Sequence, residues 1–444
     1  MLKEMVNHGA VYADAAAQLL GEYEPGVCFF LSSPRRTLLA KGEWARLWMQ
    51  PGEGSPQALS QRVNELLAAA GRTGGESIVV GAIPFDLTKP AELVVPLSAH
   101  WAGPLSFSGE DGGEAARGGE AGRGSRAREQ TVPGPGYEVS MHPAPEYYKQ
   151  SVKEAVRRMN QGLLQKVVLS RTLQLTSAEP IDLSRLLRNL ARHNPQGYTF
   201  AVNLGGGEGG LARKAGGSAG SKSAGVRTLI GASPELLITK TGLSIRANPL
   251  AGSAPRSDDP AEDERRAAAL LVSAKDRFEH KLVVEAVEAA LHPFCRSLEV
   301  PVGPSLVQTE TMWHLSTDIY GELADREVTV LDLALSLHPT PAICGTPTGL
   351  ARETILEAEP FERGFFTGTV GWCDAKGDGE WIVTIRCAEV EDRSLRLYAG
   401  AGIVADSSAE AELAETAAKF RTLLLAMGLN DPQLAAGVSA EEGL

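Results

Sequence analysis

The sequence lacks the features that mark a secreted, membrane-bound or nucleic-acid-binding protein. Its first residues, MLKEMVNHGAVYADA, contain no apolar core of a signal peptide, and no apolar run approaches the length of a membrane span. A formal net charge of −12 argues against nucleic acid or an anionic membrane as the main partner. Cysteines are few, odd in number and free of any C-x-x-C spacing: Cys28, Cys295, Cys344, Cys373 and Cys387. These absences predict a soluble cytoplasmic protein with reduced thiols.

The composition is sufficient for a large core, but two glycine-rich segments interrupt the sequence. Hydrophobic residues make up 43% of 444 residues, enough for two to three domains or one large body. Residues 106–130 and 205–225 are rich in Gly, Ala and charges of both signs, a mixture that cannot bury a core. We therefore predict a β/α portion over 1–135 that contains a disordered loop near 106–130. Residues 136–429 would form one integrated body, with 205–225 as a flexible loop inside a hairpin.

Two long helices are predicted inside this body. Residues 145–165 carry an apolar stripe that includes Tyr148 and Leu163, and the stripe leads into a short strand that begins at Lys166. Residues 259–291 read as one helix whose middle is crowded with charge, including Glu279. Such a cluster is either a solvated face or one wall of a polar site.

The rest of the chain is organised around residues 380–419. From Trp381 to Arg386 the residues alternate with a period of two, which predicts a strand that places Arg386 on a different face from Trp381. A second strand covers 395–399. Gly400, Ala401 and Gly402 then predict a turn whose backbone comes close to a ligand.

An acidic helix face follows this turn. Glu412, Glu415 and Lys419 stand at i, i+3 and i+7, so they share one face of a helix that Ser407 or Ser408 can cap. A solvated acidic helix is one interpretation. The other is a hard metal ion held by carboxylate oxygens, with Glu279 as a third ligand if the two helices meet.

Seven motifs, in this order along the chain, carry a resemblance to a known family. They are KVVLSR at Lys166, GASPELL at Gly231, PLAGS at Pro249, KDRFEHKLV at Lys275, HPTPAICGTP at His338, GWCDAKGDGEWIVTIRCAEV at Gly371 and YAGAGIV at Tyr398. Together they resemble the chorismate-utilising enzymes, which include anthranilate, aminodeoxychorismate, salicylate and isochorismate synthases. The match covers roughly residues 137–429. Within the family it is most similar to isochorismate synthases that feed 2,3-dihydroxybenzoate siderophore synthesis.

The resemblance implies an α+β fold with two antiparallel sheets stacked face to face, helices packed outside and a Mg²⁺ site between the sheets. It implies a monomer that isomerises chorismate to isochorismate by adding water at C2 and expelling the C4 hydroxyl. Such chemistry needs a base and an acid on opposite faces of the ring. By resemblance, Lys166 is the base and Glu235 is the acid.

The resemblance also implies the binding residues. Glu279, Glu412 and Glu415 would hold Mg²⁺ against the ring carboxylate. The residues expected to contact the substrate are Gly252, His314, Ala342, Ile343, Arg386, Tyr398, Gly400, Ala401, Gly402 and Lys419. Arg386 can bind a carboxylate in bidentate fashion.

Three alternatives stay open. The apolar pair Ala342 and Ile343 stands where aminating and salicylate-forming relatives carry threonine, which favours release of isochorismate. A salicylate synthase, which would go on to eliminate pyruvate, is the second enzyme hypothesis. Isochorismate could also supply menaquinone synthesis, and a catalytically inactive chorismate-binding protein is the alternative from another class.

Overall fold

The computed structural model describes residues 15–47, 55–73, 75–107, 137–205 and 226–430. Both glycine-rich segments singled out in the sequence fall largely outside these ranges. The expectations that 106–130 and 205–225 are disordered therefore stay predictions.

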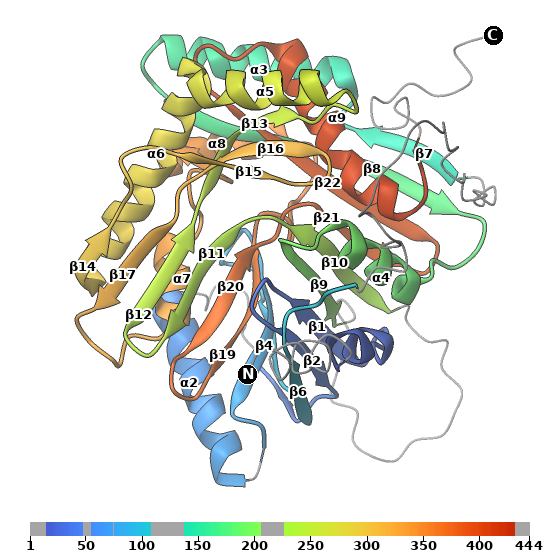
Figure 1. Cartoon of the computed structure of the whole chain (residues 1–444), viewed down its shortest axis with the longest axis vertical. Helices are drawn as coiled ribbons and strands as arrows, with labels where there is room; N and C mark the ends of the chain where they lie inside the picture. Colours follow the sequence, from blue (N-terminus) through green and yellow to red (C-terminus); the bar gives the residue numbers. More distant parts are fainter. Residues whose placement is uncertain (1–14, 48–54, 74, 108–136, 206–225, 431–444) are drawn as a thin grey trace, which may run out of the picture.

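Two large antiparallel sheets form the body of the molecule (Figure 1). Sheet A has the order β18 (Gly345–Thr346), β8 (Lys166–Ser177), β22 (Ser394–Ile403), β21 (Cys387–Glu391), β10 (Arg227–Ser233), β9 (Tyr198–Leu204), β1 (Cys28–Ser32), β2 (Thr37–Lys41), β6 (Ser98–Ala102), with β7 (Tyr137–His142) also on β8. Sheet B has the order β14 (Cys295–Glu299), β17 (Ile319–Leu323), β12 (Ser244–Asn248), β11 (Leu236–Thr241), β20 (Gly379–Val383), β19 (Thr369–Asp374), β4 (Ile78–Ile83), β5 (Glu92–Val95), β3 (Ala45–Arg46). A three-stranded sheet C, β13 (Leu250–Pro255), β16 (Met312–Ser316) and β15 (Ser305–Gln308), closes one end.

Helices cover the outer faces of both sheets, as the resemblance implies. The outer core of sheet B contains residues of α2 (Pro56–Thr73), α6 (Ala274–Leu291) and α7 (Val330–Leu337). The outer core of sheet A contains residues of α4 (Leu183–His193) and α9 (Ala409–Ala426). Helices α3 (Pro145–Asn160) and α8 (Thr348–Ala358) pack near the start of β8, and α5 (Pro260–Val272) packs on β13. A third core, which includes Val80, Phe200 and Ile382, joins side chains of both sheets.

The chain passes from one sheet to the other at two places that lie against each other. Strand β10 of sheet A continues into β11 of sheet B through Pro234 and Glu235, and β20 of sheet B continues into β21 of sheet A through residues 384–386. The two segments pair in both sheets, because Gly231 is opposite Cys387 in sheet A and Leu236 is opposite Ile382 in sheet B. The backbone N–H of Val383 donates to the carbonyl of Glu235 (3.1 Å) between these pairings. The site is built around this double crossover.

The predicted strand over 381–386 is wrong at its end. Strand β20 stops at Val383, and Arg386 has φ of +50°, in the left-handed region that few L-residues adopt. The alternating apolar pattern continues past the end of the strand, because residues 384–386 pass from one sheet to the other. Side-chain alternation alone therefore does not reveal where the strand ends.

Three other expected boundaries differ from the structure. Gly400, Ala401 and Gly402 lie inside strand β22 and form no turn. The predicted helix over 259–291 is two helices, separated at Ser273, whose side chain accepts from the N–H of Asp276 and caps α6. Helix α3 ends at Asn160 because Gly162 turns the chain with φ of +74°, and Leu163 is exposed.

Strands from the first 135 residues belong to both sheets. Strands β1, β2 and β6 extend sheet A, and β3, β4 and β5 extend sheet B, where they pair with strands of the second part. The division into residues 1–135 and 136–429 therefore stays a prediction about the chain, and the two parts share their sheets.

Candidate active site

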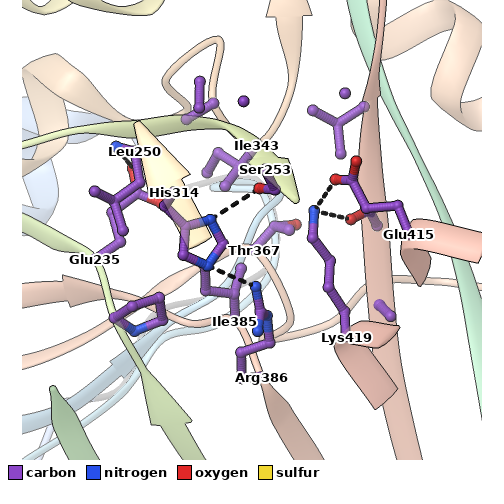
Figure 2. A pocket seen from close by; sticks show the side chains of 18 of the residues that line it. Glu235, Leu250, Ser253, His314, Ile343, Thr367, Ile385, Arg386, Glu415 and Lys419 are labelled. Atoms are coloured by element: carbon purple, nitrogen blue, oxygen red, sulfur yellow. Dashed lines mark hydrogen bonds and ion pairs between the residues drawn. The ribbon is translucent and has the colours of Figure 1, made fainter. Parts of the chain in front are cut away.

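A cavity lies at the double crossover, between the ends of the two sheets and sheet C (Figure 2). Most of the predicted site residues line it: Glu235, Gly252, Glu279, His314, Ala342, Ile343, Arg386, Tyr398, Gly400, Gly402, Glu415 and Lys419. These residues come from segments spread over nearly 200 residues of sequence. The fold therefore brings together motifs that are far apart along the chain.

Three predicted residues, Lys166, Ala401 and Glu412, do not line the cavity. All three are buried. Lys166 Nζ lies 2.9 Å from Glu279 Oε1, so it stands directly behind a lining residue. Glu412 Oε1 accepts from Lys275 Nζ (2.7 Å), one turn of α9 before Glu415.

Glu235 occupies the first crossover and is 3% exposed. One carboxylate oxygen accepts from the backbone N–H of Leu250 (3.4 Å), the bond drawn in Figure 2. Burial raises the pKa of this carboxyl to about 7, although the Leu250 N–H and the charges of Lys166, Lys419 and Arg386 act in the opposite direction. A carboxyl group with this pKa is protonated in about half of the molecules at pH 7, so it can supply a proton as a general acid must.

Arg386 occupies the second crossover, where it orients a histidine. An arginine can only donate, so its Nη2–H donates to His314 Nε2 (3.1 Å). The proton of His314 must then be on Nδ1, which donates to Ser253 Oγ (2.8 Å). Figure 2 shows His314 between these two residues. Burial, and then the charges of Arg386 and Lys419, hold the pKa of His314 well below its usual range, so the ring stays neutral.

This chain of hydrogen bonds leaves two donors for a ligand. The Ser253 hydroxyl accepts from His314, so its own proton is free to point at a cavity group. Arg386 Nη1 is buried and has no hydrogen-bond partner within the described residues. Burial lowers the pKa of Arg386 to about 10, which still leaves the guanidinium charged at neutral pH. An anionic oxygen would satisfy both donors.

Three lysine–carboxylate pairs lie on the opposite side of the cavity, and of their six residues Glu279, Glu415 and Lys419 line it. Besides Lys166–Glu279 and Lys275–Glu412, Lys419 Nζ donates to Glu415 Oε1 (2.6 Å) and to the carbonyl of Gly400 (2.9 Å). Helix α9 supplies both acidic residues of the predicted face, and Ser408 is its cap, as the sequence predicted.

The predicted metal ligands are therefore each paired with a lysine. Within the described ranges, no three His, Cys, Asp or Glu side chains are arranged as a metal site. The donor chemistry nevertheless fits a hard divalent cation. Glu412 Oε2 is buried and has no hydrogen-bond partner among the residues that the structure describes, and burial together with the neighbouring Glu415 raises the pKa of Glu412 to about 7. A bound cation would provide a partner for Glu412 Oε2 and would reduce the repulsion between the carboxylates of Glu412 and Glu415.

Carboxylate Glu279 lies close to the backbone of β22. Burial alone would raise its pKa, but the charges of Lys166, Lys275 and Lys419 outweigh burial and hold the pKa below its ordinary value. A Cβ on Gly402 would lie 2.0 Å from Glu279 Oε1, so only glycine leaves room for this carboxylate. This close approach, and not a turn, is what Gly402 provides.

Apolar side chains complete the cavity. Ala342 and Ile343 stand on one side, and the Tyr398 ring stacks on Phe366 with centroids 5.0 Å apart. Several lining residues were not predicted as site residues: Val168, Pro234, Leu250, Ala251, Ser253, Phe366, Thr367, Ile385 and Ala399. Ser253 could have been inferred, because it follows Gly252 in the PLAGS motif. Thr367, with φ of +58°, carries no signal in the sequence.

Comparison with known proteins finds relatives in the family that the motifs resemble. The family model described as chorismate binding enzyme matches residues 110–425. The isochorismate synthase DhbC of Bacillus subtilis is 53% identical over 427 residues, which cover 96% of this chain and 100% of that protein. The vibriobactin-specific isochorismate synthase of Vibrio cholerae is 40% identical, with 91% and 92% covered.

Solved structures agree with the fold. A putative 2,3-dihydroxybenzoate-specific isochorismate synthase from Bacillus anthracis has a TM-score of 0.81 at 46% identity, covering 94% of this chain and 100% of that one. The menaquinone-specific isochorismate synthase MenF of Escherichia coli has a TM-score of 0.68 at 22% identity, with 92% and 91% covered, a likeness of fold alone. Among the helices that the structure describes, none combines the length and apolar character needed to cross a membrane.

Proposed function

We propose, because the chain belongs to the chorismate-binding enzyme family, that the crossover cavity converts chorismate to isochorismate. The protein is an isochorismate synthase, and the reaction is the entry to 2,3-dihydroxybenzoate synthesis. Relatives of this specificity that match nearly the whole chain support this function. The observation that carries it is Glu235: a buried carboxyl with a pKa near 7, in one cavity with an unsatisfied arginine donor and the carboxylates of Glu279 and Glu415.

Glu235 serves as the general acid. Isomerisation forms a C–O bond from water to C2, moves the ring double bonds and breaks the bond from C4 to its hydroxyl. Hydroxide is a poor leaving group, so a proton must reach the C4 oxygen as the bond breaks. Glu235 gives that proton and becomes a carboxylate, which the nearby charges of Lys166, Lys419 and Arg386 stabilise.

Lys166 serves as the base that takes a proton from the attacking water. Its amine must be neutral at that moment. In the protein alone, Lys166 Nζ lies 2.9 Å from Glu279 Oε1, a side chain that lines the cavity. Lys166 Nζ is buried and, although it is close to Glu279, is not aligned with any described hydrogen-bond acceptor. A water molecule at the ring would donate a hydrogen bond to the neutral amine, which then takes its proton.

Each of the two substrate carboxylates would bind to a different side of the cavity. Arg386 and the Ser253 hydroxyl offer donors to the pyruvyl carboxylate, and the neutral His314 fixes the direction of both. Lys419 adds positive charge on the opposite wall.

Mg²⁺ is the expected cofactor. Glu279, Glu412 and Glu415 would hold it, and when bound it would neutralise and orient the ring carboxylate. In the protein alone, the three lysine partners neutralise these carboxylates.

The apolar wall supports the isochorismate synthase subtype. Ala342 and Ile343 line the cavity and offer no side-chain hydrogen-bond donor there, which suits release of isochorismate without further elimination. The test is purified protein with chorismate and Mg²⁺, with products separated by chromatography and pyruvate assayed in parallel. Isochorismate without pyruvate is the expected result. Pyruvate and salicylate in equal amounts would overturn the subtype, and binding of chorismate without turnover would indicate an inactive binding protein.

A further inference from the structure

Arg363 is a buried arginine that does not line the catalytic cavity, yet it is bonded to residues that do. It lies in the segment between α8 and β19 and is 4% exposed. A guanidinium has five N–H donors. Five bonds are present: Nε to Glu359 Oε2 (2.8 Å), Nη2 to Glu359 Oε1 (2.6 Å), Nη2 to the Val168 carbonyl (2.8 Å), Nη1 to the Ile343 carbonyl (2.8 Å) and Nη1 to Thr367 Oγ1 (3.2 Å).

Three of these acceptors belong to the lining of the cavity. Val168 is in β8, Ile343 is in the loop before β18, and Thr367 follows the segment that carries Arg363 itself. The arginine thus joins three lining segments that approach from different parts of the chain. Its guanidinium carbon Cζ also lies over the ring of Phe366, another lining residue, 5.8 Å from the ring centroid.

Glu359 balances the charge of Arg363 and binds the same strand. Its Oε1 also accepts from the backbone N–H of Ser170 (2.8 Å). The pair therefore holds β8 at positions 168 and 170, just beyond Lys166. Neither side chain is exposed enough to act on a ligand directly, with side-chain exposures of 3% and 2%.

Thr367 has a backbone that needs such support. Its φ of +58° is unfavourable for a β-branched residue, and its hydroxyl both accepts from Arg363 and donates to the Phe366 carbonyl (2.6 Å). Non-glycine residues with positive φ are few in the described chain, and Arg386, also at the cavity, is another. Strain at a site persists when neighbouring contacts hold it.

We propose that Arg363 is a positioning residue for the isomerisation: it fixes the spacing of the Val168, Ile343 and Thr367 segments, and so the seat of the substrate ring between Lys166 and Glu235. The proposal depends on the proposed function. It predicts that loosening the wall harms the reaction more than binding, because the carboxylate-binding groups on Arg386, Ser253 and Lys419 stay in place.

The test is Arg363→Lys. A lysine keeps the charge but has three donors on one nitrogen in place of five on three, so at least two of the five hydrogen bonds are lost and the wall segments are no longer held together by one planar group. We expect kcat for chorismate to fall at least about tenfold with KM changed less than about threefold, since small displacements at a reacting centre are costly. Hydrogen exchange of backbone amides in residues 166–170 and 341–345 should become faster.

The matched control is Arg256→Lys. Arg256 also makes paired contacts to a carboxylate, Asp263, and its partners Gln308 and Thr309 do not line the catalytic cavity. It should retain wild-type kcat. Wild-type kcat in Arg363→Lys at a temperature where it is folded, or an equal fall in the control, would overturn the proposal.

A second pair of variants covers the case in which Arg363→Lys does not fold. Thr367→Ser keeps the hydroxyl that accepts from Arg363, whereas Thr367→Ala removes it. We expect kcat to fall more in the alanine variant than in the serine variant. Equal kcat in these two variants would contradict the role of the Arg363 contact. Inactive wild-type enzyme in the same assay would instead contradict the proposed function.

Discussion

The residues that define the cavity sit where the chain leaves one sheet for the other. Glu235 and Arg386 each occupy a crossover, so neither side chain points outward from a regular strand. The identity of the acid could be predicted from the GASPELL motif, but its environment could not. A pKa near 7 results from burial by elements far away in sequence, and local sequence contains no measure of that burial.

The raised pKa of Glu235 predicts how activity and stability change with pH. Its pKa in the folded protein, about 7, is above the ordinary 4.5, so the favourable contribution of the protonated group is complete below about pH 4.5 and is lost as pH rises through 7. We expect kcat/KM to fall above pH 7. At pH 8 Glu235→Gln should raise the free energy of unfolding by about 3 kcal/mol, at about 1.4 kcal/mol per pH unit of pKa shift.

Chemical denaturation at pH 5 and pH 8 checks this difference. The stabilisation by Glu235→Gln should fall from about 3 kcal/mol at pH 8 to about 1 kcal/mol at pH 5, and Glu353→Gln, at an exposed position, is the matched control. An equal effect of Glu235→Gln at both pH values would contradict a raised pKa.

Lys166→Ala tests the base. Turnover should fall by at least about a thousandfold, within the range that general acid–base catalysis supplies, while chorismate still binds. Calorimetric titration measures binding and the chromatographic assay measures turnover. A variant that keeps more than a tenth of wild-type kcat would rule out Lys166 as the base.

At the scale of elements, strand β22 and helix α9 present the site together. The sequence placed Glu412, Glu415 and Lys419 on one helix face, and the structure confirms that face and its cap at Ser408. The glycines before the helix predict a turn whose backbone comes close to a ligand. They are in fact part of a strand, since what matters there is the space above the backbone, which depends on Glu279 from another helix.

Gly402→Ala tests that space. The added Cβ would lie 2.0 Å from Glu279 Oε1 and 3.1 Å from Lys166 Cε, so the end of the Glu279 side chain must move and its pair with Lys166 must separate. We expect a fall in kcat/KM of roughly a hundredfold with the fold intact by circular dichroism. Gly349→Ala, whose Cβ would meet no atom of the described residues within 4 Å, is the control and should keep full activity.

Glu415→Gln tests the acidic wall of α9. Loss of one anionic ligand should raise the Mg²⁺ concentration that gives half-maximal activity, by roughly ten- to a hundredfold. The same substitution leaves Lys419 without its carboxylate partner, so a metal titration of activity is needed alongside KM for chorismate. An unchanged requirement for Mg²⁺ would count against Glu415 as a ligand.

At the scale of the whole molecule, the motifs predicted the fold by resemblance, and local patterns alone could not have done so. Periodicity identifies strands such as β1 and β2, but it does not say which strands pair across hundreds of residues. The two sheets draw strands from the first 135 residues and from the remainder. A monomeric state and a cytoplasmic location stay predictions of the sequence.

Shared sheets predict that the chain does not divide at residue 135. A fragment of residues 136–444 would lack β1, β2 and β6 of sheet A and β3, β4 and β5 of sheet B, and would expose the core between the sheets. We expect it to bind a hydrophobic dye and to show no cooperative thermal transition. A fragment with a sharp transition and full activity would show that the second part folds alone.

Incorporation of solvent oxygen tests the whole account most directly. Chorismate turned over with Mg²⁺ in H₂¹⁸O should give isochorismate with one ¹⁸O atom, in the new hydroxyl at C2, because Lys166 and Glu235 add one oxygen and expel another. Mass spectrometry of the product measures the label. Unlabelled isochorismate would contradict attack by water, and with it the roles of both residues.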